Sequence, residues 1–261
     1  MTSLLVDRAV ETAYITAGIE RADSDSVKPL DRLTAANVEA SDFALIPTPE
    51  IALLTGTHGV DTTFGVSVAE SGAIAMRSPI RPDEIEDASI LLYDVSSTAE
   101  LLARATIWPY YGMKASAWTR EPDGTSTVTI VDGLAALEPV EAGFSEDLVR
   151  AWYILTEQSV VTHLLAIPVG AADEDVERIR TGLSEAVAAG YAARREVRRA
   201  LQEESSVEGD RLVAFLAGLR CELDTDDRVA AYSLIARGSG GTRFPLIREI
   251  PWRLSGESEG A

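Results

Sequence analysis

Hydroxyl side chains gather where one apolar run of this chain ends, and they are well suited to bind an anion. The apolar run 89–93 leads directly into Ser96, Ser97 and Thr98, which precede a helical segment. A helix N-terminus carries free N–H groups and a partial positive charge, so it attracts carboxylates and phosphates. We expect one of the three hydroxyls to cap the helix, and we leave open whether a second one faces a ligand.

Two further apolar runs end in polar side chains of the same kind. Asp132 and Gly133 follow the run 126–131, and Thr48 lies between two prolines after the run 43–46. Open α/β sheets bind their ligands at the carboxyl ends of their strands. Asp132 is therefore either a ligand-binding or basic group or the cap of the next helix, and its residue type slightly favours the cap. Thr48, held by the prolines, is expected to point into a cleft.

The chain lacks the motifs of several common active sites. It contains neither of the glycine-rich sequences that cradle nucleotide phosphates, and no Gly-x-Ser-x-Gly nucleophile elbow. His58 and His163 are far apart and outside any ligand-spaced set, so we expect no metal site. His163 lies in an apolar run and is predicted to be a hydrogen-bonded core residue. Cys221 is the only cysteine, which excludes an internal disulfide.

Composition and charge limit the partners. The 42 acidic and 23 basic residues give a formal charge of −19. Such a surface repels phosphate backbones and anionic lipids, so neither nucleic acid nor a membrane is expected as a partner. No stretch approaches the roughly 18 apolar residues of a membrane span, and the N-terminus lacks the pattern of a signal peptide. We therefore predict a cytoplasmic protein with a small anionic or aromatic ligand, and we leave a homodimer open.

Apolar runs and helical segments alternate along the chain, which is typical of an α/β fold with a mainly parallel sheet. The predicted strands are 43–46, 64–69, 72–76, 89–93, 126–131 and 160–169, and the predicted helices are 50–54, 99–107, 134–137, 146–156, 173–204, 210–219 and 226–237. A chain that leaves one lobe for a second and returns with helices has the plan of a two-lobed binding fold. We predict that 1–75 and 171–261 form lobe I, that 76–170 form lobe II, and that the ligand cleft lies between them.

Four arginines crowd the end of the predicted helix 173–204. They are Arg194, Arg195, Arg198 and Arg199. Basic side chains stabilise a helix C-terminus through its dipole, and this is the favoured interpretation. A phosphate-binding patch is the alternative.

Five segments, taken in order, are similar to segments of one known enzyme family. They are SDFALIPTPE at 41–50, GAIAMRSPI at 72–80, DVSSTAELL at 94–102, IVDGLAAL at 130–137 and DLVRAWYILT at 147–156. On these segments the chain resembles, over roughly residues 40 to 170, the chorismate dehydratase branch of the menaquinone-biosynthesis family of the futalosine route.

The resemblance implies a periplasmic-binding-protein type II fold used as a cytoplasmic enzyme. It also implies loss of water from chorismate to give 3-enolpyruvylbenzoate, without a metal or organic cofactor. On this hypothesis the hydroxyls at the helix start hold a substrate carboxylate and Thr48 lines the opposite wall. The candidate substrate-binding residues are Glu11, Thr48, Ser96, Ser97, Thr98 and Gly133, and the candidate catalytic residues are Asp42 and Asp132.

The chain departs from the family pattern at two places. The family's first strand usually ends in an Asn followed by a small residue and a proline, and the matching stretch 7–13 has no Asn. Ala99 replaces the family's second hydroxyl after Thr98. A cytoplasmic binding protein of the same fold, holding a small acid without catalysis, is therefore the alternative function, and a homologue without retained activity is a third.

Overall fold

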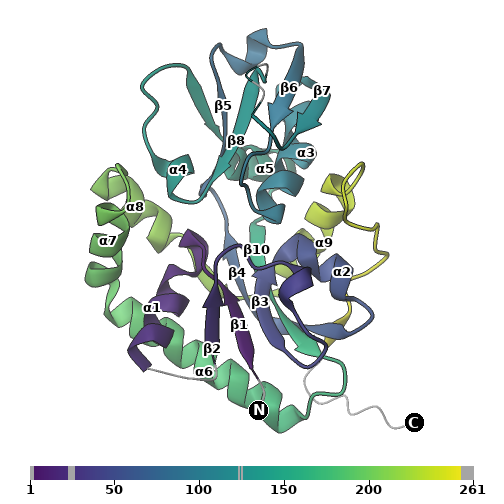
Figure 1. The fold of residues 1–261 in the computed structure, drawn as a ribbon, viewed down its shortest axis with the longest axis vertical. Helices are drawn as coiled ribbons and strands as arrows, with labels where there is room; N and C mark the ends of the chain where they lie inside the picture. Colours follow the sequence, from purple (N-terminus) through teal and green to yellow (C-terminus); the bar gives the residue numbers. More distant parts are fainter. Residues whose placement is uncertain (1–2, 23–26, 123, 125, 254–261) are drawn as a thin grey trace.

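Two lobes, each built around its own β-sheet, make up the structure (Figure 1). The computed structural model describes residues 3–22, 27–122, 124 and 126–253. The first sheet contains β1 (Leu4–Asp7), β2 (Val27–Leu30), β3 (Phe43–Pro47), β4 (His58–Val68), β10 (Val160–Pro168), β11 (Arg220–Glu222) and β12 (Trp252–Arg253). The second sheet contains β5 (Ile74–Ser78), β6 (Asp87–Leu91), β7 (Lys114–Thr119), β8 (Val128–Asp132) and β9 (Phe144–Asp147). The predicted two-lobed α/β architecture is confirmed.

The first sheet is mixed, with the strand order β11-β4-β10-β3-β1-β2 and β12 beside β4. β1 runs parallel to β2 and β3, whereas β10 runs antiparallel to both β3 and β4. The prediction of a mainly parallel sheet is wrong here, because β10 returns from the second lobe and enters the sheet against the direction of β3.

The second sheet has the order β7-β6-β8-β5-β9. β6 runs parallel to β7 and β8, and β5 runs antiparallel to β8 and β9. Parallel strands end at the same edge of a sheet, so the segments that follow β6 and β8 meet there. This pairing brings the start of the next helix after β6 beside the end of β8.

The chain crosses between the sheets twice, once after β4 and once before β10. Val68 pairs with Val160, so the two crossing segments lie side by side. Every residue of β10 is buried. A strand covered on both faces has a nearly continuous apolar sequence, and the predicted strand at 160–169 is confirmed. β10 belongs to the first sheet, although the expected boundary at residue 170 grouped it with the second lobe.

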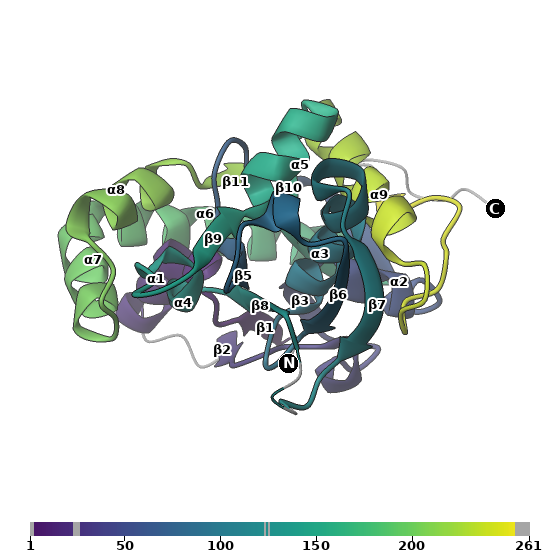
Figure 2. The same cartoon turned by 90° about the horizontal axis from the view of Figure 1, so that it is seen from above.

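Helices cover both sheets. They are α1 (Ala13–Ala22), α2 (Ile51–Leu54), α3 (Ser97–Tyr111), α4 (Leu134–Leu137), α5 (Leu148–Thr156), α6 (Asp173–Ala192), α7 (Arg194–Glu203), α8 (Gly209–Ala217) and α9 (Thr225–Gly238). α1 and α6 pack closely because glycines face the partner backbone. A Cβ at Gly190 would lie 1.9 Å from the carbonyl oxygen of Tyr14. Seen from above, α7 and α8 lie at one side of the molecule and α9 at the other (Figure 2).

The single helix predicted over 173–204 is two helices. α6 ends at Ala192 and α7 begins at Arg194, so the chain bends at Ala193. α7 then packs beside α8, and Val197 of α7 joins the main core. The apolar periodicity continues through the bend, so the sequence pattern did not reveal it. None of the described helices is long and apolar enough to cross a membrane.

Candidate active site

A cavity of about 590 Å³ lies between the two lobes. The first lobe contributes the end of β1, the 3₁₀ helix η1 (Val10–Thr12) and His163 of β10. The second lobe contributes Ser96 and Thr98 from the start of α3 and the end of β8. Ligand pockets typically have volumes of roughly 300–1,000 Å³, so the cavity has the size of a small-molecule site.

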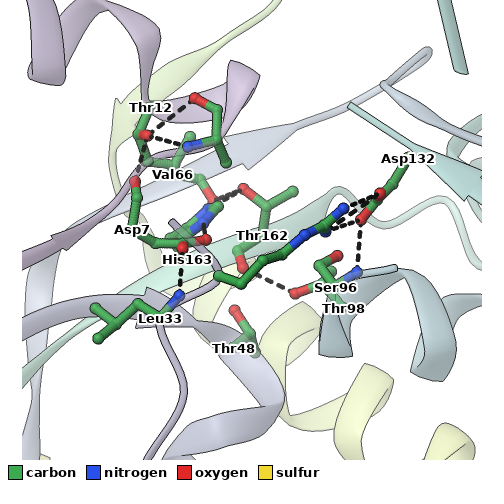
Figure 3. A network of polar contacts seen from close by, with 12 residues as sticks. Asp7, Thr12, Leu33, Thr48, Val66, Ser96, Thr98, Asp132, Thr162 and His163 are labelled. Carbon is green, nitrogen blue, oxygen red and sulfur yellow. Dashed lines mark hydrogen bonds and ion pairs between the residues drawn. The ribbon is translucent and has the colours of Figure 1, made fainter. Parts of the chain in front are cut away.

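A buried acid–histidine pair forms part of the cavity wall (Figure 3). Asp7 is the last residue of β1, and its Oδ2 lies 3.1 Å from Nε2 of His163. The other carboxylate oxygen accepts a 2.7 Å hydrogen bond from the backbone N–H of Leu33. The two paired side chains are only about 5% exposed. Both oxygens of the Asp7 carboxylate are therefore held in place.

The second ring nitrogen of His163 also faces an acceptor. Its Nδ1 lies 3.0 Å from Oγ1 of Thr162, and this hydroxyl donates to the carbonyl oxygen of Val66 at 3.2 Å. Because the hydroxyl proton is used toward Val66, the Thr162 oxygen accepts from the imidazole. Both ring nitrogens of His163 therefore lie within hydrogen-bond distance of side-chain oxygens, from Asp7 and Thr162. These contacts fix the orientation of the imidazole in the cavity wall.

The turn between β1 and η1 is fixed by Thr12. Its hydroxyl donates to the carbonyl oxygen of Asp7 at 2.6 Å and accepts from the N–H of Ala9 at 3.1 Å. These hydrogen bonds take the place of a helix cap, because Ala9 offers no polar side chain. The turn sets the first residues of η1 against the cavity.

Glu11 of η1 is a buried carboxyl in the cavity wall. Burial raises its pKa from the ordinary 4.5 to about 7. The charge of His163 and the backbone N–H of Glu11 itself oppose the rise, while Asp132 and Asp7 add to it. A carboxyl with this pKa exchanges a proton near neutral pH, as a general acid or base must.

Arg32 connects the two lobes at the cavity. It lies in the turn after β2, and its Nη1 is 3.2 Å from Oδ2 of Asp132 at the end of β8. Nη2 of Arg32 donates to the backbone carbonyl oxygen of Asp94. Nε of Arg32 lies 3.5 Å from the side-chain carboxylate of Asp94. Oδ2 of Asp132 also accepts from the N–H of Ser96 at 2.7 Å. The Asp132 carboxylate is thus neutralised from the opposite lobe, and this contact joins the lobes.

Two of the three described non-glycine residues with a positive φ angle lie at this contact. Arg32 and Asp94 have positive φ angles of 55° and 50°. The left-handed region costs a residue with a side chain about 1–2 kcal/mol. Such strain persists where the surrounding structure imposes it, and it clusters at ligand sites and moving segments.

Comparisons with solved structures identify the fold. Protein AF1704 from Archaeoglobus fulgidus is 13% identical with a TM-score of 0.68, and the match covers 92% of this chain and 98% of that one. The alkanesulfonate-binding protein SsuA from Xanthomonas axonopodis pv. citri, bound to MOPS, is 13% identical with a TM-score of 0.64 and 96% coverage of both chains. The periplasmic aliphatic sulphonate binding protein SsuA from Escherichia coli is 14% identical with a TM-score of 0.58, covering 99% and 95%.

The chain has a periplasmic-binding-protein fold. At these identities the likeness shows the fold alone. No family model matches the sequence, and no curated protein is significantly similar to it. Ligand pockets occur preferentially where two domains meet, which is where this cavity lies.

The periplasmic-binding-protein fold brings together several of the predicted site residues. Those that line the cavity are Glu11, Ser96, Thr98, Asp132 and Gly133. Oγ of Ser96 accepts from the N–H of Ala99 at 3.2 Å, so the predicted cap of α3 is confirmed. Oγ1 of Thr98 donates to the carbonyl oxygen of Thr162 at 3.0 Å and fastens the start of α3 to β10.

The interpretation of Asp132 as a helix cap is wrong. α4 begins after Gly133 and has no side-chain cap. Asp132 turns instead toward Arg32 and Ser96. The parallel pairing of β6 with β8 explains this, because it places a second helix start within reach of the Asp132 carboxylate.

Three other predicted residues do not line this cavity. Thr48 is fully buried and donates to the carbonyl oxygen of Val161 at 2.6 Å. Ser97 lines a smaller cavity of about 270 Å³, which shares Arg32 with the first. Asp42 precedes the amino end of β3, whereas Pro47 at the carboxyl end lines the cavity. A strand of five residues spans roughly 16 Å, so Asp42 lies away from the cavity.

Sequence reasoning missed Asp7, Arg32 and His163 as cavity residues. His163 is buried and hydrogen-bonded, as predicted, but it also lines the cavity. The available signal was the polar pair Thr162 and His163, which interrupts an otherwise apolar strand. Within the described part of the chain, no group of three or more His, Cys, Asp or Glu side chains could hold a metal ion.

Proposed function

We propose that the cavity between the lobes binds a small organic acid and removes water from it, with chorismate as the candidate substrate. The observation that carries this proposal is Glu11, a carboxyl with a pKa of about 7 in the wall of a ligand-sized cavity. Chorismate is the substrate of the enzyme family that the chain resembles along 41–50, 72–80, 94–102, 130–137 and 147–156.

One proton-transfer group is sufficient for this reaction. Ionised Glu11 takes a ring proton from the substrate, the electrons of that C–H bond form the new double bond, and the neighbouring C–O bond breaks. Protonated Glu11 then gives its proton to the departing hydroxide, so the products are water and an aromatic ring. Efficiency is highest when the pKa of the group lies near the working pH. Aromatisation supplies the driving force.

The cavity offers cationic groups for the substrate's carboxylates. Arg8 and Arg32 both line it, and about half of each side chain is exposed. A guanidinium binds a carboxylate through two parallel hydrogen bonds. Arg32 already forms an ion pair with the carboxylate of Asp132, and a substrate carboxylate would form the same kind of ion pair with it.

Turnover of chorismate tests the proposal directly. The purified protein is incubated with chorismate, and 3-enolpyruvylbenzoate is followed by liquid chromatography and mass spectrometry. Glu11→Gln should abolish turnover while retaining the shape of the site, and the exposed Glu185→Gln on α6 is the matched control. Absence of turnover, together with no thermal stabilisation by chorismate or its product, overturns both the reaction and the ligand.

Binding without catalysis is the second candidate. It is favoured by the contact between Arg32 and Asp132, which joins the lobes as a bound ligand would, and by the missing Asn in 7–13. The two SsuA proteins bind sulfonates, which are small anions. Thermal stabilisation by chorismate or another small acid without any turnover supports this candidate and excludes the enzyme.

A further inference from the structure

A second groove, of about 870 Å³, lies on the first lobe and shares no lining residue with the cavity between the lobes. The end of α6, the start of α7, α8 and β11 surround it. Its apolar wall includes Val213, Leu216 and Leu219, and α7 contributes Arg194, Arg195 and Arg198. The segment 220–224 adds Arg220, Glu222 and Asp224, and Arg220 pairs with Asp224. The groove therefore combines an apolar surface with a cluster of three arginines on α7, and its carboxylates belong to the separate segment 220–224.

The bend at Ala193 places these arginines at the start of a helix and not at its end. In one continuous helix they would stabilise the C-terminal end through the dipole. In the structure they lie in the first two turns of α7, where the dipole disfavours positive charge. Only Arg194 reaches back to α6, donating to the carbonyl oxygen of Tyr191 at 3.4 Å. Stabilisation of a helix end does not explain Arg195 and Arg198.

The described part of the chain offers these three arginines no acidic partner. Among the residues that the structure describes, no carboxylate forms an ion pair with Arg194, Arg195 or Arg198. Their neighbour Arg199, outside the groove, pairs with Glu203. The chain carries a formal charge of −19, so carboxylates are abundant. Three like charges without partners repel one another, and an anion in the groove removes that repulsion.

An aromatic surface lies beside the charges. The ring of Tyr191 is 57% exposed and meets the ring of Tyr14 edge to face at 5.8 Å. The guanidinium of Arg194 lies 5.2 Å from the centre of the Tyr191 ring. Tyrosine rings and arginine planes both stack on planar ligands, and guanidinium groups bind phosphate oxygens in pairs. The chemistry fits a planar ring that carries phosphate.

We propose that this groove is a second ligand site and that it binds a phosphorylated aromatic molecule of nucleotide size. Arg195 and Arg198 hold the phosphates, and Tyr191 with the apolar wall holds the ring. The site is independent of the proposed dehydratase activity. Its volume lies within the usual range for small-molecule pockets, roughly 300–1,000 Å³.

The test uses the full chain, with ATP and inorganic pyrophosphate as probes in magnesium-free buffer and affinities measured by titration calorimetry. The double variant Arg195→Ala/Arg198→Ala should weaken ATP binding about a hundredfold or more, because it removes two charge-assisted hydrogen-bonding groups. Arg199→Ala, one residue away but paired and outside the groove, should leave the affinity unchanged. Tyr191→Ala should weaken ATP binding more than pyrophosphate binding.

Three outcomes overturn the proposal. They are no binding of either probe, ATP binding that the double variant leaves unchanged, and equal effects of Arg199→Ala and the double variant. Tighter binding of an acidic peptide such as polyglutamate than of ATP shows instead a docking surface for a protein. Circular dichroism of each variant separates loss of binding from loss of folding.

Discussion

Replacement of Glu11 by Gln should stabilise the protein at neutral and alkaline pH. Folding raises the pKa of this carboxyl from the ordinary 4.5 to about 7, so the folded state holds the proton more tightly than the unfolded state. At pH values below 4.5 the carboxyl is protonated in both states and costs nothing. Between pH 4.5 and about 7 the unfolded state gives up this proton while the folded state keeps it, so the free energy of unfolding falls across this range and levels off above it. A tenfold change in proton affinity is worth about 1.36 kcal/mol, so the rise from 4.5 to about 7 corresponds to about 3 kcal/mol, all of it lost above pH 7.

Urea denaturation of the natural protein and Glu11→Gln at pH values from 4.5 to 8 measures this effect. The variant should gain stability relative to the natural protein as the pH rises, by about 3 kcal/mol at pH 8 compared with pH 4.5. The exposed Glu185→Gln on α6 serves as the control and should show a flat difference. A flat or falling difference for Glu11→Gln would refute the assignment of Glu11 as a buried proton-exchanging group.

Three further substitutions test other parts of the structure. Asp132→Asn removes the ion pair between the lobes and should increase the radius of gyration in small-angle scattering. It should lower the free energy of unfolding by only about 1 kcal/mol, because Arg32 is half exposed. The control Asp83→Asn breaks an exposed ion pair within the second lobe and should leave the radius unchanged. His163→Ala leaves the Asp7 carboxylate buried without its partner and should cost about 3–5 kcal/mol in urea denaturation. Thr98→Val, which removes one buried neutral hydrogen bond, is the reference. A smaller loss of stability for His163→Ala than for Thr98→Val would show that water replaces the imidazole. Gly190→Ala places a Cβ against the carbonyl oxygen of Tyr14 and should cost about 1–3 kcal/mol. Gly182→Ala lies on the same helix, where a Cβ meets open space, and should stabilise the protein by about 0.5–1 kcal/mol. Similar effects of Gly190→Ala and Gly182→Ala on stability would contradict the close packing of α1 on α6.

Long apolar or periodic segments of the chain were predictable. The strands at β3 and β10 and the helices α3, α8 and α9 lie close to their expected ranges, because burial and turn residues mark them locally. Four strands were not predicted. β2, β7 and β9 have no distinctive apolar run, and the apolar run of β1 is only three residues long. Their conformation depends on neighbouring strands, which no local pattern records.

The sequence alone determined the local features of the site. Ser96 caps α3 because a hydroxyl stands before a helix start, and Asp132 ends a strand because apolar residues precede it. The sequence also provided the hydroxyl and carboxyl side chains that the fold gathers between the lobes.

Only the tertiary structure decided which of these residues meet. Asp7 and His163 are 156 positions apart, and Arg32 and Asp132 are 100 positions apart. Each pair depends on the order of strands in a sheet or on the approach of one lobe to the other, which are fixed by the packing of the whole core. The position of Asp42 at the wrong end of β3, the raised pKa of Glu11 and the bend that gathers three arginines in one groove follow from that packing alone.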